Sequence, residues 1–483
     1  MIKRAGLKVA IFTLFATGYG VNAAFVWPTP HFPVNVGVAE PAQKYSPEMM
    51  RKRAEAERVI VVNKEKLRQK PDDVQAHKAI GDAYLFLDEY ESAFNSYKEV
   101  LRVTPNDAEA YRGMGRTYDK VGDSAKALDF YKEAVRLDPG FGRAQADLGR
   151  TLVRLYRYKE AINPLKEGIR LKPKNGVDHD DYFSLGEAYL RTGQYQDAVG
   201  AYRKALEIVP GHVWTQAGLA EAHIALKQYD QAIASAKLAL KQGPYDARTN
   251  RMLGDAYAGM HQYDKAIEYY KESIRVSPHR YQIEALLRLG LTYNRLGRHE
   301  EAVTVFEKGI QFASTPRQFA FEAEINPELL PGLYFSTAEA NLNLGRGQMA
   351  ADAGRKYIEI KGWSDPNAAY AAMLSYFGSR KAGRVAEAKK MVEEALSRDE
   401  AKNWPGPILK YVNGDLKEKD LFTLATDNDK MTEARAYVGL SLELVGRRDD
   451  ARTHLEWVIK NGNREFIEYT LSQAELRRLT SAR

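Results

Sequence analysis

The chain contains no cysteine among its 483 residues. Disulfide bonds, a thiol nucleophile, thiolate metal sites and a lipid-modified N-terminal cysteine are therefore excluded. No Asn-x-Ser/Thr sequon occurs either, so N-glycosylation gives no support for a eukaryotic secretory route. Excess charge is small: the formal net charge is +7, and Lys3, Arg4 and Lys8 supply three of these charges, which leaves +4 for the rest. This balance argues against nucleic acid as a partner.

Motifs of common catalytic and cofactor sites are missing as well. The nine histidines include no His-Glu-x-x-His pair, and there is no Gly-x-Ser-x-Gly elbow and no Gly-x-x-x-x-Gly-Lys phosphate loop. Residues 178–181 (Asp-His-Asp-Asp) have the residue types of metal ligands. Four consecutive residues cannot all face one ion, and Asp is common at helix starts, so we favour a helix cap over a metal site. We predict no enzymatic activity, no cofactor and no metal.

The segment 1–24 has the pattern of a signal peptide. A basic start is followed by an apolar stretch at 9–21 and by the small residues Ala23 and Ala24, which is typical of cleaved export signals. The alternative is a membrane anchor over Val9–Trp27, just long enough to span a bilayer. Polar and small residues within it favour cleavage. In both cases we expect the rest of the chain outside the cytoplasm, periplasmic or secreted, or held at the inner membrane by the anchor.

Residues 25–46 are expected to form an extended linker, because proline cannot continue a helix. Four prolines lie in this region, Pro28, Pro30, Pro33 and Pro41, and Pro47 follows directly after it. An alternative is a docking strip that uses the aromatic side chains Phe25, Trp27 and Phe32.

From Pro71 onward the chain repeats itself with a period of about 34 residues, a length typical of helical repeats. Three series of markers keep this period in phase, with one slip near 174–178. The prolines are Pro71, Pro105, Pro139 and Pro173, then Pro210, Pro244 and Pro278. The small residues are Gly81, Gly115, Gly149, Gly186, Ala220 and Gly254, and then Ala93, Ala127, Ala161, Ala198, Ala232 and Ala266. Each unit contains two amphipathic helical patterns, so the period predicts a stack of helix pairs.

The markers within one unit resemble the tetratricopeptide repeat. In the fourth unit they are Tyr182, Leu185, Gly186, Tyr189, Ala198, Tyr202, Ala205 and Pro210. The resemblance implies an all-α, right-handed superhelical solenoid, with seven repeats over 74–316. We expect a capping helix at 47–73, degenerate repeats at 317–430, and a last repeat with a C-terminal capping helix at 431–483. The stretch after Trp404 also resembles the C-terminal part of bacterial envelope repeat adaptors.

In this family the first helix of each repeat lines a concave groove. Carried onto this sequence, the groove positions are basic in the second and third repeats and apolar farther along: Arg112, Arg116, Lys120, Arg143, Arg150 and Arg154, then Phe183, Leu190, Trp214 and Ile224. An acidic peptide segment with apolar anchors would fit such a groove. The alternative is a solvated helix face paired with local acids.

We therefore expect an exported scaffold that binds a protein segment in its groove and assembles partners in the bacterial envelope. The alternative is a membrane-anchored assembly factor of a secretion or surface structure. Enzymatic activity is not expected, because helix pairs leave no stretch for a sheet-based catalytic domain.

Overall fold

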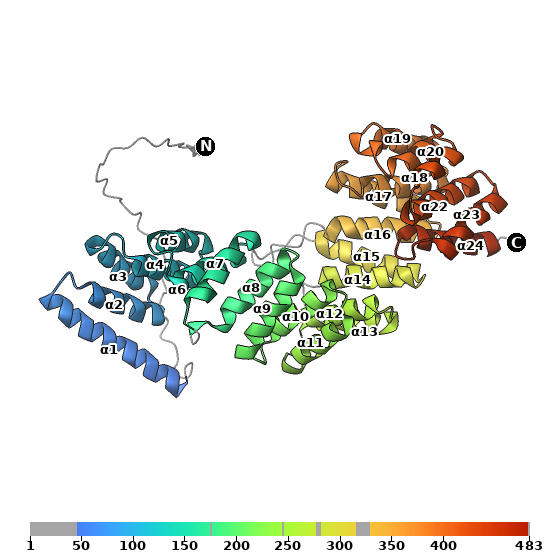
Figure 1. Ribbon diagram of the computed structural model, residues 1–483. Helices are drawn as coiled ribbons and strands as arrows, with labels where there is room; N and C mark the ends of the chain where they lie inside the picture. Colours follow the sequence, from blue (N-terminus) through green and yellow to red (C-terminus); the bar gives the residue numbers. More distant parts are fainter. Residues whose placement is uncertain (1–45, 174–175, 244–245, 277–281, 315–328, 482–483) are drawn as a thin grey trace, which may run out of the picture. The chain divides into compact units, whose positions relative to one another are not determined.

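The computed structural model describes residues 46–173, 176–243, 246–276, 282–314 and 329–481. Within these ranges the regular structure is helical and contains no β-strand (Figure 1). None of the helices in the described ranges is long and apolar enough to cross a membrane. The signal peptide predicted at 1–24 and all but Ser46 of the predicted linker lie outside the described residues. The packing divides the chain into two compact units, Met1–Ala144 and Gln145–Arg483.

Unit 1 consists of one long helix followed by two helix pairs and the start of α6. Aspartates cap several of these helices: the Asp73, Asp107 and Asp123 side chains each accept a hydrogen bond from the backbone N–H three residues later. Such caps satisfy donors that the first helical turn leaves open. The helices are α1 (Pro47–Gln69), α2 (Val74–Phe86), α3 (Tyr90–Val103), α4 (Ala108–Lys120), α5 (Ser124–Leu137) and α6 (Gly142–Arg154).

Unit 2 begins within α6 and continues with further helix pairs. Its regular part contains α7 (Tyr158–Leu171), α8 (His179–Arg191), α9 (Tyr195–Ile208), α10 (Val213–Ala225), α11 (Tyr229–Gln242), α12 (Ala247–Gly259), α13 (Tyr263–Val276), α14 (Gln282–Arg295) and α15 (His299–Ser314). From α8 onward, each first helix packs on its own second helix and on the second helix of the preceding repeat. The predicted all-α solenoid of helix pairs is confirmed.

The small residue of each first helix makes room for a large side chain of the second. A β-carbon built on Gly254 would lie 2.5 Å from the Tyr270 ring, and one on Gly186 would lie 2.6 Å from the Tyr202 ring. Since real β-carbons do not approach other atoms so closely, only glycine fits opposite these rings. In the fifth repeat the second helix carries Ala236 at the tyrosine position, and Ala220 stands where the other repeats have glycine. The marker series seen in the sequence thus reflects side-chain volume.

The C-terminal part of unit 2 covers the region predicted as degenerate repeats and the last repeat. Two helix pairs come first, then a short 3-10 helix and two short helices, and then a third pair and a final helix. They are α16 (Leu329–Asn343), α17 (Gly347–Lys361), α18 (Ala368–Lys381), α19 (Val385–Leu396), η3 (Asp399–Lys402), α20 (Gly406–Asn413), α21 (Glu418–Leu424), α22 (Asn428–Leu444), α23 (Arg448–Asn461) and α24 (Ile467–Ser481). The helices share one apolar core around Phe377 and Tyr437.

The final helix, α24, packs on α22 and α23 and also on α16, which is far from it in the sequence (Figure 1). Two wholly buried carboxyl groups lie at these contacts. The Glu339 carboxyl of α16 accepts a hydrogen bond from the Thr470 hydroxyl at 2.8 Å, and burial raises its pKa to about 7. The Glu468 carboxyl of α24 accepts one from the Tyr437 hydroxyl at 2.8 Å. Burial, reinforced by the nearby Glu433 carboxyl, raises the pKa of Glu468 to about 8.

Candidate binding face

In unit 1 the predicted binding residues lie on the first helix α4 and at the start of α6. Arg116 of α4 forms an ion pair with Asp82 of α2, with 2.9 Å between Nη1 and Oδ1. The same Asp82 oxygen accepts a hydrogen bond from the buried Tyr97 hydroxyl at 2.9 Å. The Arg112 guanidinium lies over the Phe141 ring, 5.7 Å from its centre. Arg116 is thus paired with a local acid, as the alternative interpretation of the basic positions predicts.

Two other predicted cations of unit 1 are exposed. Lys120 is the last residue of α4, and Arg143 is the second residue of α6. Because solvent surrounds both side chains, a partner carboxylate can reach them without breaking into the packed helices.

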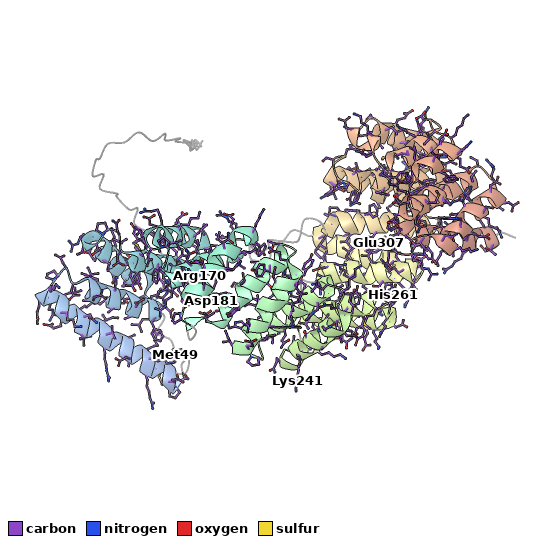
Figure 2. The ribbon with its side chains drawn as sticks, viewed as in Figure 1. Met49, Arg170, Asp181, Lys241, His261 and Glu307 are labelled. Carbon is purple, nitrogen blue, oxygen red and sulfur yellow. The ribbon has the colours of Figure 1, made fainter. Side chains whose placement is uncertain are left out.

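Arg150, in unit 2, does not fit the prediction that it faces a ligand. Its guanidinium bonds to the Asp147 carboxylate and lies 2.9 Å from an Asp181 oxygen. The Asp181 carboxyl is fully buried and also accepts from the Lys172 ammonium. Burial raises the pKa of Asp181, although Lys172 and Arg150 favour its charged form. Arg150 therefore joins α6 to the start of α8 (Figure 2 labels Asp181) and is committed to the fold.

The remaining predicted positions differ in exposure. Arg154, the last residue of α6, is exposed and donates to the Thr151 hydroxyl at 2.8 Å. Trp214 is 45% exposed on α10. Leu190 is only 6% exposed and belongs to a core cluster with Tyr202, so the prediction that it offers apolar surface is wrong. Phe183 and Ile224 are half-buried and pack against core clusters.

One feature of this face was missed in the sequence. Buried second-helix tyrosines donate their hydroxyl hydrogen bonds to acids on the first helix of the same repeat. The pairs are Tyr97 with Asp82, Tyr131 with Asp119, Tyr202 with Glu187, and Tyr270 with Asp255. The sequence carries no consistent signal for these pairs, because the second repeat has Arg116 at the position of Asp82 and its Tyr131 bonds to Asp119 instead, and the fifth repeat has Glu221 at that position but Ala236 in place of the tyrosine. These acids satisfy buried hydroxyls.

In the middle of unit 2 the first-helix face is neutralised by ion pairs between neighbouring repeats. Glu221 of α10 lies 3.0 Å from Arg191 of α8 and 2.5 Å from Arg248 of α12. Burial alone would raise the pKa of Glu221, but Arg248 and Arg191 outweigh it and hold the pKa at about 2. Arg251 likewise pairs with Asp255, and it lies 3.5 Å from Glu284. These cations are already matched by local carboxylates.

The acidic group at 178–181 is a helix cap, as expected. The Asp178 side chain accepts from the Asp181 backbone N–H at 3.1 Å, and the Asp181 side chain accepts from the Asp178 backbone N–H at 3.2 Å. His179 lies 2.7 Å from the Thr215 hydroxyl through Nε2. In the part of the chain that the structure describes, no three His, Asp or Glu side chains are arranged to hold a metal ion.

Stacked helix pairs with a first-helix face on each unit define a helical-repeat binding protein. Family models identify the repeats. Models described as "Tetratricopeptide repeat" match residues 108–141, 146–213, 189–255 and 245–314, and one described as "TPR repeat" matches 81–122. The chain is a tetratricopeptide repeat protein. Such repeats generally serve as scaffolds for protein or peptide partners, and this chain is a protein-interaction scaffold.

Three of the solved structures that are similar to the chain are those of YrrB, MamA and PilF. YrrB, described as a TPR protein with an unusual peptide-binding site, is 22% identical, and the match covers 38% of this chain and 94% of YrrB with a TM-score of 0.35. MamA from Desulfovibrio magneticus RS-1 is 26% identical, with coverages of 36% and 94% and a TM-score of 0.32. PilF from Pseudomonas aeruginosa is 21% identical, with coverages of 43% and 95% and a TM-score of 0.36. No curated protein matches the chain.

Proposed function

We propose that this protein is an exported scaffold of the bacterial envelope that binds an acidic protein segment through the exposed cations of unit 1. One observation supports this binding site: Lys120 of α4 and Arg143 of α6 are exposed on consecutive first helices. In the middle of unit 2, by contrast, the arginines Arg191, Arg248 and Arg251 are already paired with local acids.

Recognition in this proposal depends on charge-assisted hydrogen bonds between these cations and carboxylates of the partner. The arginine fork can hold a carboxylate in two-point contact, and lysine adds a point charge. Arg116 positions the face through its own ion pair with Asp82. Export is supported by the basic, apolar and small-residue order of the segment 1–24.

A pull-down from bacterial envelope extract tests the site. The double variant Lys120→Glu and Arg143→Glu reverses the exposed charges without touching the buried ion pairs. We expect proteins captured by the wild type to be depleted at least tenfold. The matched control is Arg170→Glu, which reverses an exposed charge on the second helix α7 (labelled in Figure 2). Full capture by the double variant would overturn the proposed site.

Cell fractionation tests the location. A mature N-terminus near residue 24, in the periplasmic or secreted fraction, is the expected result. Recovery from the membrane with Met1 retained would instead favour the anchored assembly factor, and recovery from the cytoplasm would contradict export.

A further inference from the structure

A groove between α1 and α2 adds an apolar pocket to the cationic face of unit 1. We propose that this groove takes a large apolar side chain of the same acidic partner segment. The inference rests on the proposed function and names the second chemical element of the partner: an apolar anchor next to acidic residues.

The groove is lined by small and apolar side chains and by three charged ones at its rim. The apolar part consists of Ala56 and Val59 of α1 with Ala79, Ala83 and Phe86 of α2, the charged residues are Lys52, Glu55 and Asp82, and the volume of the open groove is about 440 Å³. This volume is enough for one large side chain. Phe86 is 42% exposed although aromatic rings are usually more deeply buried. The alanines leave space beside this ring that a partner side chain can fill.

Contacts between α1 and α2 fix the two helices that form the groove. Ala56 and Ile60 of α1 pack against Ala83 and Leu87, which places the two helices in close contact. Farther toward the start of α1, Arg53 donates to the Leu87 carbonyl at 3.4 Å. Because these contacts fix both helices, the pocket is preformed and a ligand does not have to open it.

The register of α2 and α4 relates the groove to the cations of α4. The Asp82–Arg116 ion pair joins the same position of two consecutive repeats, so equivalent positions of the two helices are neighbours. Phe86 and Lys120 also occupy equivalent positions, one helical turn farther along each helix. Phe86 of the groove and the exposed Lys120 therefore lie at equivalent positions of two neighbouring first helices.

Charge decides which kind of segment fits. Three acids of this surface have partners of their own: Asp82 binds Arg116 and the Tyr97 hydroxyl, Asp119 binds the Tyr131 hydroxyl, and Glu55 at the groove lies 3.7 Å from Arg58. Lys120 is exposed at the open end of α4. A segment with an apolar residue flanked by carboxylates complements this surface, whereas a lysine-rich segment would be repelled.

Fluorescence anisotropy with the full chain and three labelled nonapeptides tests the inference. The first peptide has a central Phe flanked by Asp, the second has Ser in place of Phe, and the third has Lys in place of Asp. We expect the Asp-flanked Phe peptide to bind at least tenfold more tightly than the other two. Its binding should weaken as salt rises, because the contribution of the cations is screened.

Variants then separate the groove from the charges. Phe86→Ala removes one wall of the groove, and Ala79→Leu fills the groove from a half-buried position. Each variant should lower the affinity for the Asp-flanked Phe peptide about tenfold and change the affinity for the Ser peptide by less than twofold. Val61→Ala is the matched control, because Val61 is 68% exposed on α1 outside the groove. Circular dichroism verifies that every variant is folded.

Each outcome is decisive. If Phe86→Ala and Ala79→Leu leave the affinity for the Phe peptide unchanged, the groove is not a binding pocket. If Lys120→Glu still weakens the binding of both Asp-flanked peptides, the groove proposal fails but the proposed function stands. If Lys120→Glu leaves their binding unchanged as well, both proposals fail. If removal of residues 25–45 strengthens binding tenfold, the chain's own N-terminal segment is the occupant and the proposal is overturned.

Discussion

Replacing Glu468 by glutamine should remove a pH-dependent loss of stability from the C-terminal part of unit 2. The Glu468 carboxyl is wholly buried between α24 and α22, where it accepts a hydrogen bond from Tyr437. Burial, together with the Glu433 and Glu339 carboxyls, raises its pKa from the ordinary 4.5 to about 8. The folded state therefore keeps a proton that the unfolded chain releases above pH 4.5.

The sign and the size of the effect follow from this difference. A group with a raised pKa contributes its full stability below the unfolded pKa and loses it as the pH rises toward the folded pKa. For Glu468 the loss runs from about pH 4.5 to about pH 8. One pKa unit corresponds to about 1.4 kcal/mol, so at pH 7 the loss is on the order of 3 kcal/mol. Glutamine has a similar shape, can accept from Tyr437, and does not ionise.

Urea unfolding followed by tryptophan fluorescence measures this difference, because Trp363, Trp404 and Trp457 all lie in the C-terminal part of the chain. The free energy of unfolding of Glu468→Gln should match that of the wild type at pH 4.5 and exceed it increasingly up to pH 8. Glu456→Gln, an exposed residue of α23, serves as the control and should follow the wild type. A constant gap between Glu468→Gln and wild type across this range would refute the reasoning.

Three further changes probe the repeats and their caps by chemical denaturation. Gly254→Ala should cost about 1–3 kcal/mol, because the new methyl meets the Tyr270 ring; Gly200→Ala, with open space around it, should be neutral or stabilise by up to about 1 kcal/mol. Equal effects of the two changes would contradict the steric argument. Tyr270→Phe should cost about 1 kcal/mol through loss of its 2.8 Å hydrogen bond to Asp255, and an unchanged unfolding midpoint would be evidence against this pairing. Asp178→Ala should cost about 1 kcal/mol by removing the cap of α8; Asp178→Asn, which can still cap, should lose less.

Much of the repeat fold could be predicted, because its determinants are local. A glycine such as Gly254 and a tyrosine such as Tyr270 lie within one repeat, so their spacing records the volumes that pack together. The cap at Asp178 was predictable for the same reason. Side-chain partners that lie in a different repeat could not be predicted from the sequence. Arg150 stands at a groove position, yet its carboxylate partners include Asp181 of the following repeat.

The apolar part of the face shows the same limit. Leu190 has the helical position of a groove residue, but tertiary packing buries it beside Tyr202. The α1–α2 groove could not be foreseen either, because α1 carries no repeat marker and its contacts with Ala83 and Leu87 follow only from its docking. Helical periodicity predicts which way a side chain points from its own helix, but it does not predict which residues of other helices the side chain contacts.

The sequence by itself determined that this protein is a stack of helix pairs, because a period of about 34 residues with small and large residues in phase permits no other common packing. Tertiary structure alone decided which charged residues remain available. It paired Arg116 and Arg150 with acids and left Lys120 and Arg143 exposed. It also brought α24 against α16, with Thr470 bonded to Glu339. Contacts so distant in sequence depend on the accumulated geometry of the intervening helices, and no local pattern encodes them.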